Sequence, residues 1–102
     1  MHQLLNNTKW EEIRQRMYQL GNNIQWRTKD VESGYVSDWD GEWYYHFKLG
    51  GYATIEWVEI LTPTNFLKES VLNVLKEIHV PGKILSISIM VYGYSNHSVD
   101  YL

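Results

Sequence analysis

The feature that most constrains this chain is a change in the spacing of its apolar residues. In two segments they recur every three or four positions, which is typical of amphipathic helices, and elsewhere they alternate with polar residues, which is typical of half-buried strands. This spacing predicts two helices, a meander of four antiparallel strands and a final strand. The helices are expected at residues 9–20 and 65–79, and the strands at residues 24–29, 35–39, 42–49, 52–60 and 84–92.

This order of elements indicates an α+β fold. Each predicted helix has a single apolar face, so we expect both helices to cover the same face of a five-stranded sheet and to leave the other face open. The connection through the second helix is long enough for the final strand to run parallel to a neighbour, which would make the sheet mixed. A chain of 102 residues has the length of one domain, residues 1–102.

Short local signals give the ends of the elements. Thr8 and Glu11 have the spacing of a capping box at the start of the first helix, and Gly21 suits its end. Asp40 and Gly41 suit a two-residue hairpin turn between the second and third strands. In the final strand, alternation predicts four inward-facing side chains: Leu85, Ile87, Ile89 and Val91.

The turn at Gly50 and Gly51 sets the register of the central hairpin. A three-residue loop at 49–51 places apolar side chains opposite one another, pairing Phe47 with Ala53, Tyr45 with Ile55 and Trp43 with Trp57. In this register Trp43, Tyr45 and Phe47 face the core. The neighbouring side chains Tyr44, His46 and Glu56 then lie on the open face.

The composition excludes several classes of function. The chain has no cysteine, which excludes a disulfide framework, a thiolate zinc site and a thiol nucleophile. Nine basic residues against twelve acidic ones give no surplus for binding phosphates, so we expect no nucleic-acid partner. No apolar stretch approaches the ~18 residues of a membrane span, and the first residues lack the pattern of a secretory signal. We therefore expect a cytoplasmic protein without a membrane partner.

Residues 30–47 form the most distinctive window, because they include five acidic residues and several Tyr and Trp residues but no Lys or Arg. Acidic side chains among amphipathic aromatic ones suit contact with a basic protein. Our leading hypothesis is a non-enzymatic binding module that resembles inhibitor or immunity proteins in size and charge. The residues predicted to form its surface are Tyr35, Trp39, Asp40, Glu42, Tyr44, His46 and Glu56.

The same face has other interpretations. In the predicted register His46 lies diagonal to Glu56, and a carboxylate can orient an imidazole for acid–base catalysis. A small enzyme or ligand-binding domain would use these two residues, with Tyr44 and Lys48 as supporting donors. A solvated face without a partner is the simplest interpretation, and pairing of an open edge strand with a second copy would give a homodimer.

A metal site is not expected. In the window from Asp38 to Glu42 the glycine falls at the fourth place, whereas a calcium loop requires it at the sixth. No other motif indicates a cofactor.

Several strings of the sequence, including WRTKD at residues 26–30 and WDGEW at residues 39–43, resemble a family of small bacterial proteins of unknown function. The resemblance extends over most of the chain, and its parts lie at residues 7–12, 26–35, 39–47, 55–60, 91–94 and 99–102. It implies a bacterial origin and assigns no activity, cofactor or partner.

Overall fold

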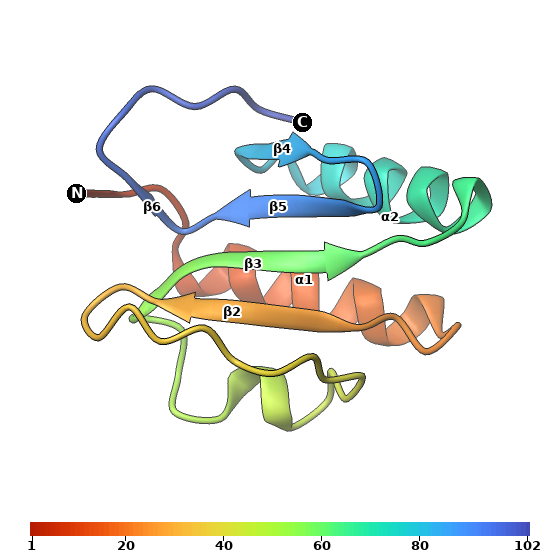
Figure 1. Ribbon diagram of the computed structural model, residues 1–102, viewed down its shortest axis with the longest axis horizontal. Helices are drawn as coiled ribbons and strands as arrows, with labels where there is room; N and C mark the ends of the chain where they lie inside the picture. The colour runs from red at the N-terminus through yellow and green to blue at the C-terminus, as the bar shows by residue number, and fades with distance from the viewer.

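The computed structural model describes residues 1–102 and has the predicted α+β fold. Two helices, α1 (Asn7–Leu20) and α2 (Asn65–Ile78), lie on one face of a four-stranded sheet, and the opposite face carries no helix (Figure 1). A separate pair joins β1 (His2–Gln3) to β6 (Tyr94–Ser95). The larger sheet has, in spatial order, β2 (Trp26–Asp30), β3 (Ile55–Leu61), β5 (Ser88–Tyr92) and β4 (Gly82–Ile84).

All neighbouring strands of this sheet are antiparallel. The prediction of a mixed sheet is therefore wrong. The segment expected to form one final strand is divided into β4 and β5, which pair as a hairpin. Ile89 and Val91 are buried as predicted, but Ile87 is exposed because it lies in the turn between the two strands. Leu85 is only partly buried there, and its carbonyl accepts a hydrogen bond from Lys68 Nζ at 2.7 Å.

The first helix begins two residues before its predicted start. Its cap is Asn6, whose side-chain oxygen accepts a hydrogen bond from the Lys9 amide at 2.9 Å. The predicted capping box of Thr8 and Glu11 is wrong, because the Glu11 carboxylate is used by Arg14 and Tyr52 instead. The helix ends at Gly21 as predicted, with φ of 67°.

The two predicted strands at 35–39 and 42–49 do not form, and the hairpin pairings expected around Phe47 are absent. Instead β2 pairs directly with β3, and the connecting segment runs along the outer edge of β2 and contains a 3-10 helix, η1 (His46–Lys48) (Figure 1). Two isolated bridges, Trp26 with Asp40 and Lys29 with Val36, place part of this segment where a fifth strand was expected.

The alternating pattern of residues 42–49 predicted a strand, but this segment forms a helical turn. Trp43 and Phe47 are buried four residues apart, whereas Tyr45 between them is 56% exposed. The side chain of Glu42 accepts hydrogen bonds from the backbone amides of Tyr44, Tyr45 and His46. These amides are therefore not available to a strand ladder, and the carboxylate stabilises the turn.

The core lies between the helices and the covered face of the sheet. Opposite one another on that face are Val58 with Val91 and Ile60 with Ile89, all fully buried. They belong to one cluster with apolar residues of both helices, of which the most buried are Trp10, Ile13, Met17, Val71 and Leu75. The apolar stripes of both helices are thus core, as their spacing predicts.

The chain itself covers the β2 edge of the larger sheet and the beginning of the β4 edge. At the β2 edge, Ser37 donates its amide to the Thr28 carbonyl at 2.9 Å. At the β4 edge, Gly82 donates to the Asp100 carbonyl and Leu102 donates to the Val80 carbonyl, both at 3.0 Å. Edge pairing between two copies would require one of these segments to move away.

We predict that Gly93→Ala destabilises the fold by roughly 1–3 kcal/mol, the usual cost of overpacking. A Cβ atom at Gly93 would lie 2.2 Å from the Ile55 carbonyl oxygen and 2.8 Å from the ring of buried Trp10. Urea unfolding measures the change. The matched control is Gly41→Ala, whose Cβ would meet only the end of the exposed Asn23 side chain. Equal stability of the two variants would contradict the close approach at Gly93.

Candidate functional site

The predicted binding residues lie mainly on an irregular segment beside the sheet and not on its open face. We call residues 30–47 the acidic aromatic loop. Four of its aromatic side chains are exposed. Their exposed fractions are 66% for Tyr35, 37% for Trp39, 57% for Tyr44 and 56% for Tyr45. The structure therefore brings these four side chains to the surface, although the strands expected to carry them are absent.

Trp39 marks the boundary between this loop and the open sheet face. Its ring stacks on the Arg27 guanidinium, with 4.6 Å from Cζ to the ring centroid. Arg27 in turn donates from Nε to the Glu59 carboxylate at 2.8 Å, and Ser88 donates to the other oxygen of that carboxylate at 2.7 Å. Trp39 is thus held against a chain of polar contacts that crosses β2, β3 and β5.

The acidic residues of the loop also shape its backbone. Asp40 accepts a hydrogen bond from the Glu42 amide at 2.8 Å, and Glu42 accepts from the three amides that follow Trp43. The His46 amide makes the largest contribution to lowering the pKa of Glu42 below its ordinary value, because it binds the charged carboxylate. Glu42 is consequently ionised at neutral pH.

The structure gives His46 a different partner from the predicted one. Its Nδ1 atom lies 2.8 Å from Asp40 Oδ2, whereas Glu56 on β3 faces Lys29 Nζ at 3.7 Å. No hydrogen bond or ion pair joins His46 to Glu56. The predicted diagonal contact depended on the central hairpin, which does not form. Because an ionised carboxylate only accepts, Asp40 favours a proton on Nδ1 and leaves Nε2 of the neutral ring as an acceptor.

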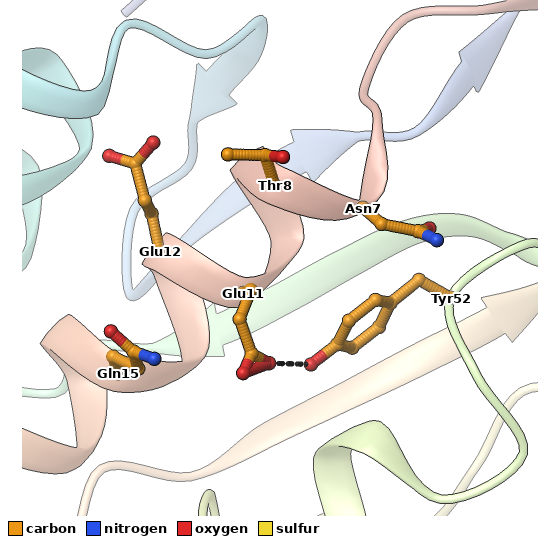
Figure 2. Close-up of a pocket in the computed structure, with 6 residues that line it drawn as sticks. All are labelled: Asn7, Thr8, Glu11, Glu12, Gln15 and Tyr52. Atoms are coloured by element: carbon orange, nitrogen blue, oxygen red, sulfur yellow. Dashed lines mark hydrogen bonds between the residues drawn. The ribbon is translucent and has the colours of Figure 1, made fainter.

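Sequence reasoning missed the residues that fasten this loop to helix α1. Arg14 is only 7% exposed and binds Glu11 through two hydrogen bonds of 2.8 Å. A further N–H of Arg14 donates to the Tyr44 carbonyl at 2.7 Å, and the Tyr52 hydroxyl donates to Glu11 (Figure 2). The available signal was the position of Arg14 on the apolar face of the helix, four residues after Trp10.

This anchor is suited to structure and not to proton transfer. The Arg14 hydrogen bonds are the main reason why the pKa of Glu11 is lowered to about 2, and burial is the main reason why the pKa of Tyr52 is raised. A carboxylate that is so weakly basic and a phenol that is so weakly acidic both keep their charge states near neutral pH. The arrangement holds residues 44 and 52 against α1.

Among known proteins, this chain matches one family, and that family has no assigned function. Residues 1–98 match the family described as Family of unknown function (DUF6678). The chain belongs to this family. Neither the curated proteins nor the solved structures contain a match. Membership of DUF6678 confirms the predicted resemblance to a family of unknown function.

Two further findings concern the whole of this DUF6678 member. Its histidine and acidic side chains form no group of three or more that could hold a metal ion. Neither of its helices has the length and apolar character needed to span a membrane.

We predict that Glu11 makes stability depend on pH. Its pKa of about 2 is below the ordinary value of 4.5, so its stabilising effect is complete above pH 4.5 and is lost as the pH falls towards 2. Glu11→Gln should lower the free energy of unfolding at pH 7 by about 1 kcal/mol, a figure reduced for solvent screening because 38% of the side chain is exposed.

Urea unfolding at several pH values measures this effect. The difference between the wild type and Glu11→Gln should shrink between pH 4.5 and pH 2. The matched control is Glu12→Gln, since Glu12 is the next residue, is exposed and turns away from Tyr52 (Figure 2). A pH-independent difference between the wild type and Glu11→Gln would disprove the assigned role of Glu11.

Proposed function

We propose that this chain is a non-enzymatic protein-binding module and that its acidic aromatic loop binds a basic protein. The observation that carries the proposal is the exposure of four amphipathic aromatic side chains in a segment with five carboxylates and no Lys or Arg. Tyr and Trp anchor protein interfaces because they combine a large apolar surface with a polar edge. Such side chains in an acidic surrounding favour a partner with a basic surface.

The charge distribution supports a basic partner. Outside residues 30–47 the chain has nine basic and seven acidic side chains, so the loop alone makes the net charge negative. Carboxylates concentrated in one segment attract a basic partner and increase its rate of association. A basic partner would therefore approach the loop in preference to the rest of the surface.

The internal contacts of the loop also support binding. Its underside is fixed by the buried rings of Trp43 and Phe47 and by the bond from Arg14 to the Tyr44 carbonyl. An ordered backbone reduces the entropy that is lost when Tyr44 and Tyr45 are immobilised in a complex. The exposed rings are thus carried by a segment that the fold already holds in place.

Within this proposal the chain acts as an inhibitor or immunity-like protein. It would cover a basic surface of its partner and so block access to that surface. The cytoplasm is the compartment in which we expect this encounter. The analogy with such proteins rests on size, charge and aromatic content.

A small enzyme or ligand-binding domain is the second candidate. The contact between Asp40 and His46 favours it, because a carboxylate that orients an imidazole is a common acid–base arrangement. Lys48 lies 5.5 Å from the Tyr44 ring centroid, so both supporting donors of this hypothesis are close together. Replacing His46 by Gln would abolish turnover in an enzyme, because a Gln side chain cannot transfer a proton.

We predict that the double variant Trp39→Ala, Tyr44→Ala loses at least tenfold in partner recovery. Pull-down from a bacterial lysate, with proteins quantified by mass spectrometry, measures the loss. The expected partner has a basic surface, and its retention should weaken as salt is raised. Thermal melting of each variant checks that the fold is intact.

The matched control for this experiment is Phe66→Ala. Phe66 is exposed on α2 and lies outside the acidic aromatic loop. Equal recovery by the wild type and the double variant would count against the proposed surface, as would a loss caused by Phe66→Ala that is just as large.

A further inference from the structure

A small cleft lies between β2 and η1, and Asp30, His46 and Phe47 of the acidic aromatic loop form part of its lining. Its volume is about 170 Å³. Three buried apolar side chains, Trp26, Phe47 and Ile55, contribute to its lining. The consecutive Gly50 and Gly51, both at φ near +80°, form part of its wall without side chains. A Cβ atom built on either glycine would meet no heavy atom within 4 Å, so the space beside the glycines is open.

The size of this cleft limits what can enter it. An apolar cavity of roughly 150 Å³ holds one benzene molecule, which has six heavy atoms. A group of about five or six heavy atoms matches the volume of this cleft. A lysine side chain has five heavy atoms, whereas an arginine side chain has seven, including a planar group of four.

Polar residues also line the cleft, and they include Asp30, Thr28, Thr54 and His46. Asp30 accepts hydrogen bonds from the Ser33 amide and hydroxyl at 2.8 and 2.6 Å, which hold the carboxylate in place.

The one cation that lines the cleft has a partner on the neighbouring strand. This is Lys29, whose Nζ lies 3.7 Å from the Glu56 carboxylate. Because Glu56 offsets the charge of Lys29, the charge of Asp30 stays available to a guest.

We propose that this cleft binds a lysine side chain of the basic partner. The methylene groups lie over the rings of Trp26 and Phe47, and the ammonium group donates to Asp30 and to Nε2 of His46. Aromatic rings attract a cation, and a carboxylate completes its neutralisation. This inference rests on the proposed function, which it extends by naming the side chain that the partner inserts.

Titration with amino-acid amides, followed by the amide signals of the 15N-labelled full chain, tests the proposal. The probe is Nα-acetyl-lysine methylamide, and the reporters are the amides of Thr28, Gly50, Gly51 and Thr54. We expect saturable shifts that are confined to these residues and their neighbours. The arginine amide should bind at least threefold more weakly, and the norleucine amide, which lacks the ammonium group, should cause no saturable shift.

The variant Asp30→Asn removes the charge and keeps an oxygen that Ser33 can bind. It should weaken the binding of the lysine amide at least fivefold. The matched control is Glu32→Gln, which removes the same charge two residues away, at an exposed position that does not line the cleft. This control should change the affinity by less than twofold.

Three results would overturn the proposal. They are the absence of saturable shifts with the lysine amide, equal binding of the norleucine or arginine amide, and equal effects of Asp30→Asn and Glu32→Gln. A failure here together with partner recovery that depends on Trp39 and Tyr44 would leave the proposed function intact. If the lysine amide binds saturably but partner recovery does not depend on Trp39 and Tyr44, the proposal for the cleft stands and the proposed binding surface is wrong.

Discussion

The packing of Trp43 and Phe47 against Trp26 is the interaction on which the surface of this protein depends. The Phe47 ring lies 5.1 Å from that of Trp26 and 4.8 Å from that of Trp43, measured between centroids. Trp43 and Phe47 are buried while Tyr45 between them is exposed, which indicates a helical turn, since all three side chains would share one face of a strand. This single cluster therefore exposes Tyr44, Tyr45 and His46, and two of its members, Trp26 and Phe47, also line the small cleft.

Carboxylates have two effects in this structure: they stabilise it through hydrogen bonds, and they give it negative charge. Those of Glu11, Asp30 and Glu42 accept several hydrogen bonds from the chain, and each has a lowered pKa for that reason. They stabilise turns and anchor the loop to α1, and they remain charged well below neutral pH. Asp30 and Glu42, two of the five carboxylates of the loop, therefore keep their charge wherever the fold persists.

The proposed surface and the proposed cleft are parts of one region. His46 connects them, because its ring lines the cleft and its Nδ1 atom contacts Asp40 in the acidic aromatic loop. A basic partner that reaches the exposed rings would have the cleft within the same contact area. Membership of a family of unknown function assigns no role to the surface or to the cleft. The two proposals therefore depend on the geometry and charge of these residues.

The sequence by itself determined the α+β class, both helices, their placement on one face and the acidic aromatic character of residues 30–47. These follow from local periodicity and composition, which need no knowledge of distant contacts. The tertiary structure alone decided the pairing of β2 with β3, the turn at 42–48 and the contact of His46 with Asp40. Trp43 and Phe47 fit both an alternating and a four-residue spacing, and only the position of Trp26, the bond from Arg14 and the capping by Glu42 select between them.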